Sequence, residues 1–268
     1  MNVRDLQRLL TAAGYYKAGL DGDFGPKTSE AVSKVLERNE PKALRWSSKR
    51  QRIAAAQVIL NAAGYEAGTV DGYAGHNTLE AFNAWDYRQT HGRDEVLPGR
   101  SDVEISTSTV STSWPPQSRV RSFFGEPGNP QCTAGKVELP ISFRIAWNKS
   151  QRVRRFSCHV KVQDALTGIY GEAVKHYGER TFVEMGLDLF GGCYNFRKMR
   201  GGSSYSMHAW GIAVDHDPER NQLRWGRDRA TFARPEYDAW WKIVEAHGAT
   251  SLGRARNYDW MHFQFANI

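Results

Sequence analysis

Apolar residues near the start of the chain recur at helical spacing. Leu6, Leu9 and Leu10 fall on one face of a helix, and Gly14 stands where helices commonly end. An Asp-Gly turn follows, and Pro26 suits the first position of another helix. The pattern predicts a helix, a glycine-rich loop and a second helix.

The same pattern occurs twice. The segment "LQRLLTAAGYYKAGLDGDFGPKTSEAV" begins at Leu6, and "AQVILNAAGYEAGTVDGYAGHNTLEAF" begins at Ala56, an offset of 50 residues without a gap. Both copies keep a glutamine, the Ala-Ala-Gly-Tyr turn, the Asp-Gly pair and Thr-x-Glu-Ala. Because self-similarity at a fixed period indicates a duplicated unit, we expect repeat 1 over residues 1–45 and repeat 2 over residues 46–100.

The repeats resemble the peptidoglycan-binding domain of bacterial and phage cell-wall hydrolases, which carries an Asp-Gly-x-x-Gly loop before Thr-x-x-Ala. The resemblance implies peptidoglycan as a partner. In repeat 2, Ala74 replaces Phe24 and His76 replaces Pro26, which leaves open whether both copies bind. The alternative is a pair of generic helical hairpins.

The stretch "DVEISTSTVSTSWPPQ" separates two differently patterned halves. It is rich in Ser and Thr and ends in two prolines, which predicts a linker over residues 101–115 and a separate domain over residues 116–268. Its β-branched alternation would alternatively suit an edge strand.

The second half mixes helical and strand patterns. One helix face carries Val162, Ala165, Leu166, Ile169, Tyr170 and Val174, with Gly178 beyond its end. Another helix is predicted from Pro235 to Gly248, and its aromatic pair Trp240 and Trp241 is expected in the core.

The final ten residues, "DWMHFQFANI", alternate as a strand does. Met261, Phe263 and Phe265 occupy one side, and Trp260, His262 and Gln264 occupy the other. With the apolar side in the core, His262 would point to the opposite face, where an imidazole needs a partner.

Upstream, "SMHAWGIAVDHD" places His208 seven residues before Asp215. Gly211 can supply a bend, and the apolar run 212–214 reads as a buried strand that delivers Asp215 at its end. A lone His near an Asp is most commonly structural. Together with His262, however, the two residues offer two imidazoles and a carboxylate, a set that suits Zn²⁺ with its fourth position open.

These motifs are similar to those of the zinc D,D-peptidase family of VanX and VanY type, which includes phage L-alanyl-D-glutamate endopeptidases. "SMHAWGIAVD" matches its Ser-x-His-x-x-Gly-x-Ala-x-Asp signature, and "DWMHF" matches a second motif with an acidic residue three before the last zinc-binding His. The resemblance implies a multidomain chain: small all-α peptidoglycan-binding repeats, then an α+β zinc peptidase domain with an antiparallel sheet. It also implies zinc on His208, Asp215 and His262.

The same resemblance implies roles for further residues. Asp259 matches the catalytic base, Arg197 resembles the arginine that steadies the oxyanion, with Arg200 as the competing choice, and Ser206 would lie near the substrate. Zinc lowers the pKa of bound water to about 7, which makes the nucleophile available at neutral pH. The structural alternatives are a salt bridge for Arg197 and a turn cap for Asp259.

The amino-acid composition favours some classes of binding partner over others. A net charge of +7 and a pI near 9.3 favour an anionic partner. The basic residues are scattered, and the dense cluster "SQRVRRFSCH" accompanies no nucleic-acid-binding signature, so we expect a solvated surface and no nucleic acid. No apolar run reaches membrane-spanning length, so no stable membrane insertion is expected. Cys132, Cys158 and Cys193 form no CxxC pair and are expected to be buried, reduced thiols.

The sequence as a whole predicts a monomeric peptidoglycan hydrolase, a phage endolysin that cleaves the stem peptide at the L-alanyl-D-glutamate bond. The N-terminus does not read as a signal peptide, so the protein is expected in the host cytoplasm until it is released to the cell wall. The alternatives are a D-alanyl-D-alanine carboxypeptidase with the same metal chemistry and a wall-binding protein with an inactive peptidase domain.

Overall fold

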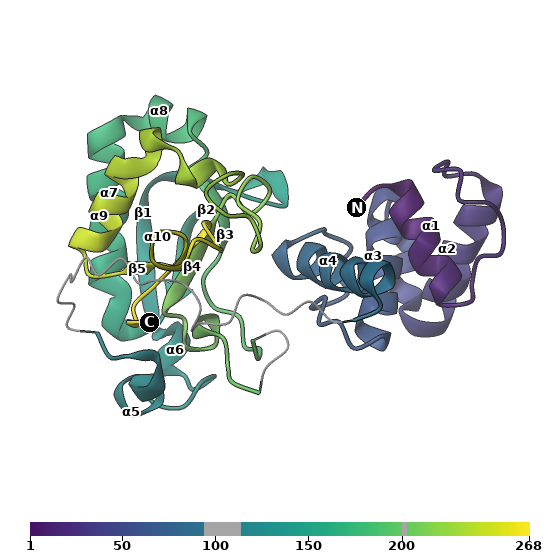
Figure 1. The fold of residues 1–268 in the computed structure, drawn as a ribbon, viewed down its shortest axis with the longest axis horizontal. Coiled ribbons are helices and arrows are strands. Elements are labelled where there is room, and N and C mark those ends of the chain that lie inside the picture. Colours follow the sequence, from purple (N-terminus) through teal and green to yellow (C-terminus); the bar gives the residue numbers. More distant parts are fainter. Residues whose placement is uncertain (94–113, 200–202) are drawn as a thin grey trace. The chain divides into compact units, whose positions relative to one another are not determined.

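The computed structural model describes residues 1–93, 114–199 and 203–268. The chain divides into two compact units, an N-terminal unit within Met1–Leu97 and a C-terminal unit within Pro98–Ile268 (Figure 1). The predicted linker over residues 101–115 lies outside the described residues except for its last two positions. Arg200, the competing oxyanion residue, also lies outside them.

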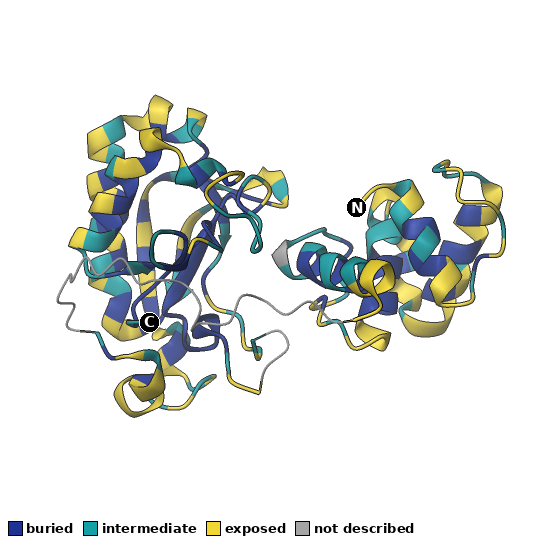
Figure 2. Ribbon diagram, in the orientation of Figure 1, coloured by how far each residue is buried: buried dark blue, intermediate teal, exposed yellow. Residues whose placement is uncertain are grey.

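The N-terminal unit is helical, as the sequence predicts. Its elements are α1 (Val3–Ala12), α2 (Pro26–Asn39), the 3₁₀ helix η1 (Pro41–Arg45), α3 (Ser48–Ala62) and α4 (His76–His91). Gly14, just beyond α1, has φ +79°, and Pro26 is the first residue of α2, so both predicted punctuation residues are confirmed. The two repeats share one hydrophobic core, to which Leu9, Val35 and Leu60 contribute fully buried side chains. Figure 2 shows buried residues, in dark blue, along the helices of this unit.

A buried glutamine explains part of what the two repeats have in common. Gln7 is fully buried; its Nε2 donates to Asp21 Oδ1 at 2.6 Å, and its Oε1 accepts from the Gly22 N–H at 2.9 Å. Gln57 makes the same two contacts with Asp71 and the glycine after it, both at 2.9 Å. One amide therefore fixes each Asp-Gly loop against its first helix, satisfying polar groups that burial would otherwise penalise.

The loop of repeat 2 is covered by Trp46, just before α3, and by Arg50 in the first turn of α3. The Arg50 guanidinium lies 4.1 Å from the ring centroid of Trp46 and 4.7 Å from that of Tyr73, and it donates to the Asp71 carbonyl at 2.7 Å. Gly72 is buried, and a Cβ there would lie 2.7 Å from the Arg50 carbonyl oxygen. The two loops therefore share their internal hydrogen bonds but differ in their surroundings.

The C-terminal unit mixes helices and strands. Its helices are η2 (Gln117–Arg119), α5 (Val120–Phe124), α6 (Gln131–Ala134), η3 (Val160–Val162), α7 (Gln163–Tyr177), α8 (Glu179–Glu184), η4 (Met207–Trp210), η5 (Thr231–Ala233), η6 (Pro235–Tyr237), α9 (Asp238–Ala246) and α10 (Leu252–Arg256). Its strands are β1 (Gly135–Ile145), β2 (Asn148–Cys158), β3 (Leu189–Gly192), β4 (Ala213–His216), β5 (Thr250–Ser251) and β6 (His262–Gln264).

Among the described residues, the strands form one six-stranded sheet in the order β2-β1-β3-β4-β6-β5. Neighbouring strands run antiparallel except β1 and β3, which are parallel. The mixed helix and sheet architecture with a mainly antiparallel sheet agrees with the predicted fold class of this half. In β4 and β6, Asp215 and His262 are direct cross-strand partners.

Helices α7 and α9 pack on one face of this sheet (Figure 1). Tyr170 of α7 and Trp240 of α9 both contact the ring of His216, and Trp240 also contacts Phe263, as expected for core aromatics. Because side chains alternate along a strand, Asp215 and His262 point to the opposite face.

The C-terminal strand is shorter than the alternation predicts. Asp259 has φ +56°, a left-handed conformation that turns the chain just before β6. Asp215 also lies within β4 rather than at its end. The next residue, His216, is fully buried against the helices, and its Nε2 lies 2.9 Å from the Tyr170 hydroxyl oxygen. Burial lowers the pKa of His216 to about 4, so it is a neutral core residue.

The prolines that close the expected linker lie beside the C-terminus. Asn267 accepts from the Gln117 N–H at 2.9 Å and donates to the Pro115 carbonyl at 2.9 Å, and Pro116 forms an isolated bridge with Asn267. The described residues at this end of the expected linker therefore form a single bridge and not the edge strand that was the alternative.

The three cysteines are buried, as expected. Burial raises the pKa of the Cys158 thiol to about 12, which keeps it protonated at neutral pH. Within the described part of the chain, no helix is both long and apolar enough to span a bilayer.

Candidate metal centre

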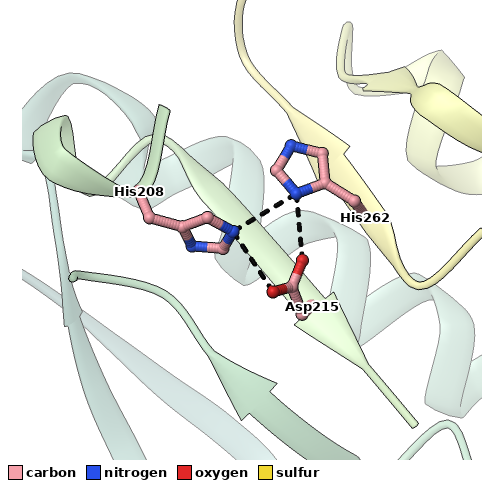
Figure 3. A group of neighbouring side chains, drawn as sticks. All are labelled: His208, Asp215 and His262. Carbon is pink, nitrogen blue, oxygen red and sulfur yellow. Dashed lines mark hydrogen bonds and ion pairs between the residues drawn. The ribbon is translucent and has the colours of Figure 1, made fainter. Parts of the chain in front are cut away.

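His208, Asp215 and His262 come together on the face of the sheet opposite α7 and α9 (Figure 3). The Nε2 atom of His208 lies 3.2 Å from Asp215 Oδ2 and 3.2 Å from His262 Nδ1, and His262 Nδ1 lies 2.9 Å from Asp215 Oδ1. All three side chains are buried. The sequence therefore identified three residues that the fold places in one cluster, although 54 positions separate the two histidines.

Local backbone geometry delivers His208 and Asp215 to this point. His208 lies in η4, and the chain then turns at Gly211, which has φ +66° and leads into β4. A Cβ at Gly211 would lie 2.2 Å from the Cys132 carbonyl oxygen, so both conformation and space require glycine. The predicted bend is confirmed.

The orientation of His208 is fixed by a backbone carbonyl. Its Nδ1 donates to the Cys193 oxygen at 2.7 Å, so in the neutral ring Nε2 carries a lone pair. That lone pair faces the Asp215 carboxylate, and two acceptors at this distance repel unless a proton or a metal ion lies between them. The donor set therefore fits a metal ion, and two nitrogens with one oxygen are among the ligand sets that zinc accepts.

Asp215 is held as an anion. Burial acts to raise its pKa, but when the two histidines are protonated, the positive charge of His208 and the hydrogen bonds from His208 and His262 outweigh burial and hold the pKa well below its usual range. A metal ion would take the place of these protons on His208 Nε2 and His262 Nδ1. An ionised carboxylate beside two imidazoles is ready to bind a cation.

Asp259 lies beside the cluster. Its Oδ2 is 4.0 Å from His262 Nδ1, farther than the mutual contacts of the other three groups. Its backbone N–H donates to the Leu223 carbonyl at 2.8 Å, and its carbonyl accepts from the His262 N–H at 3.0 Å. Left-handed backbone in a non-glycine residue is costly and is concentrated at functional sites. This placement is compatible with a proton acceptor next to the metal position.

Arg197 and Ser206 are joined through their backbones. The Ser206 N–H donates to the Arg197 carbonyl at 3.1 Å, and Ser206 is the N-cap residue of η4, next to Met207 and His208. The Arg197 side chain donates to the Lys198 carbonyl at 3.3 Å. Within the described residues, no contact joins this guanidinium to the metal cluster, so both assigned roles stay predictions.

Gly191 packs directly against Asp215. A Cβ at Gly191 would lie 2.9 Å from the Asp215 carbonyl oxygen and 3.0 Å from its Cβ, too close without movement of β4. We therefore expect Gly191→Ala to displace Asp215 and, if the cluster binds zinc, to weaken that binding about 10- to 100-fold, the range typical for residues that support ligands. Competition with a chromophoric chelator measures this.

The matched control for that substitution is Gly171→Ala in α7, where a Cβ would meet nothing within 4 Å. It should leave the zinc affinity unchanged, because α7 packs on the opposite face of the sheet. A Gly191→Ala protein that binds zinc as the wild type does would show that β4 accommodates the methyl group and that Gly191 has no part in placing Asp215.

Sequence reasoning missed several contributors to the site. Gly191 and the Cys193 carbonyl act through backbone proximity, which has no signal in the pattern of side chains. The predicted strand puts Gln264 on the same face as His262, and this spacing of two residues is a signal for a neighbour of the ring.

Comparison with known families supports the assignment of repeat 1. Residues 1–38 match the family model described as a peptidoglycan binding domain, a range that contains α1, the Asp-Gly loop and nearly all of α2. The match supports a cell-wall-binding module with peptidoglycan as its partner. No curated protein and no solved structure matches the chain.

Proposed function

We propose that this chain is a peptidoglycan hydrolase in which His208, Asp215 and His262 hold zinc. The observation that carries the proposal is the buried His-Asp-His cluster, with the Asp259 carboxylate beside it, in a chain whose N-terminus matches a peptidoglycan-binding family. Structural zinc sites have four protein ligands, whereas catalytic sites have three and keep one position for water or substrate. A three-residue cluster therefore favours catalysis.

Each residue at the site has a different role in peptide hydrolysis. Zinc, when bound, supplies a Lewis acid and an acidified water. Asp259 accepts the proton of the attacking water and passes it to the departing amine. Arg197 offsets negative charge on the tetrahedral carbon's oxygen, and Ser206 contacts the substrate.

For the bond, we favour L-alanyl-D-glutamate in the stem peptide, because Asp at position 259 resembles the endolysin branch of the zinc peptidases. The runner-up is D-alanyl-D-alanine carboxypeptidase activity. Mass spectrometry of muropeptides released from defined peptidoglycan separates them. A new N-terminal D-Glu supports the endopeptidase, and free D-Ala supports the carboxypeptidase.

In this proposal the protein is a monomeric phage endolysin that stays in the host cytoplasm until it reaches the wall. A wall-binding protein with an inactive peptidase domain is the alternative from another class. A zymogram on purified sacculi separates the two, because clearing requires hydrolysis whereas binding alone leaves the sacculi intact.

The N-terminal repeats should concentrate the enzyme on its polymer without altering its chemistry. We expect deletion of residues 1–100 to weaken binding to sacculi while sparing hydrolysis of a small soluble peptide. The reason is that the buried core of the N-terminal unit shares no residue with that of the C-terminal unit. Sedimentation with sacculi and a soluble-peptide assay measure the two effects. Unchanged sedimentation of the truncated protein would contradict wall binding by the repeats.

A further inference from the structure

We propose that Gln264 is a positioning residue that holds His262 with Nδ1 directed at the metal. The inference rests on the zinc centre proposed above. Gln264 is 1% exposed and follows His262 by two positions in β6, so both side chains leave the same face of the strand. The Gln264 Oε1 atom lies 3.2 Å from His262 Nε2, the ring nitrogen that faces away from the cluster.

The direction of the Gln264 amide is fixed by its other contact. Its Nε2 donates to the Ala266 carbonyl at 2.9 Å, and a carbonyl oxygen can only accept. The amide oxygen must therefore be the atom that faces His262. With the amide reversed, two oxygens would face each other at the Ala266 end.

This arrangement determines which nitrogen of His262 carries the hydrogen. An amide oxygen can only accept, so His262 Nε2 must donate to it. A neutral imidazole protonated at Nε2 has its lone pair on Nδ1, the atom 2.9 Å from Asp215 and 3.2 Å from His208. By accepting from His262 Nε2, Gln264 thus leaves the lone pair of His262 Nδ1 available to a metal ion.

The strands around Gln264 leave room for this role. Its cross-strand partners are Ala213 on β4 and Thr250 on β5, both smaller than glutamine. The two histidines are also oriented differently: a backbone carbonyl fixes His208, whereas a side chain fixes His262. Only the second arrangement can be removed by a substitution.

The test compares two variants of the full chain, each titrated with zinc against a chromophoric chelator. Gln264→Met keeps the length but removes the acceptor, and Gln264→Glu keeps an acceptor oxygen. Both lose the donor to Ala266, so their difference reports the contact with His262. We expect Gln264→Met to bind zinc about 10- to 100-fold more weakly than the wild type and Gln264→Glu to recover most of that loss. Gln131→Met, at an exposed position, is the control.

A space-filling role would reverse this order. The apolar Met would then be harmless, and the buried charge of Glu would be the damaging change. Wild-type zinc affinity in Gln264→Met therefore overturns the proposal.

A second measurement needs no variant. Nitrogen-15 NMR of the zinc-loaded wild type should show His262 coordinated through Nδ1 and protonated at Nε2, and coordination through Nε2 overturns the proposal. If the wild type binds no zinc, the metal centre and this inference both fail. If it binds zinc and cleaves peptidoglycan but Gln264→Met binds zinc equally well, only the role of Gln264 fails.

Discussion

Removal of zinc should abolish hydrolysis of sacculi, and added zinc should restore it. His262→Ala should also abolish hydrolysis, and added zinc should not restore it. The reason is that two remaining protein ligands are too few to hold the ion in a site that keeps one position open. We expect this variant to lose both bound zinc and activity. Metal analysis of the purified protein and muropeptide release from sacculi measure the two losses together.

The matched control is His176→Ala, an exposed histidine near the end of α7, on the helix-covered side of the sheet. It should retain wild-type zinc content and activity. An active wild-type preparation that contains no zinc and is insensitive to chelator would show that the cluster is not a zinc centre and would remove metal chemistry from the mechanism.

The cluster itself was within reach of the sequence. A bend at Gly211, a buried strand leading to Asp215 and the alternation that turns His262 away from the core were all predicted from the sequence. The resemblance to the zinc peptidases then implied that His208, Asp215 and His262 bind one metal ion. The helices were equally accessible, since Gly14, Pro26 and Gly178 mark helix ends in both sequence and structure.

The parts that could not be predicted depend on contacts between distant segments. The Cys193 carbonyl orients a histidine 15 positions later, and Gly191 touches Asp215 across a strand pair. Neither residue contributes a functional side chain to its contact, so neither can be recognised from the sequence. The same reason explains why β6 is shorter than predicted, since the turn at Asp259 is held by the Leu223 carbonyl from another loop.

The roles of Asp259 and His262 can be separated, although the two residues belong to one short motif. Asp259→Asn removes the proton acceptor while keeping the size and polarity of the side chain. Asparagine also tolerates the left-handed backbone that Asp259 adopts at φ +56°, so the turn into β6 should survive. We expect this variant to fold, to bind about one zinc per chain, and to lose on the order of a hundredfold or more in rate.

Asp164→Asn, at an exposed position in α7, makes the same chemical change away from the site and should be silent. An Asp259→Asn protein that lacks zinc would make Asp259 a metal ligand or a group that orients one. Near-normal turnover would remove it from the mechanism. Zinc retained with the rate lost is the result that assigns Asp259 to proton transfer. The 4.0 Å between its Oδ2 and His262 Nδ1 agrees with a group that would act beside the metal position rather than bind the ion.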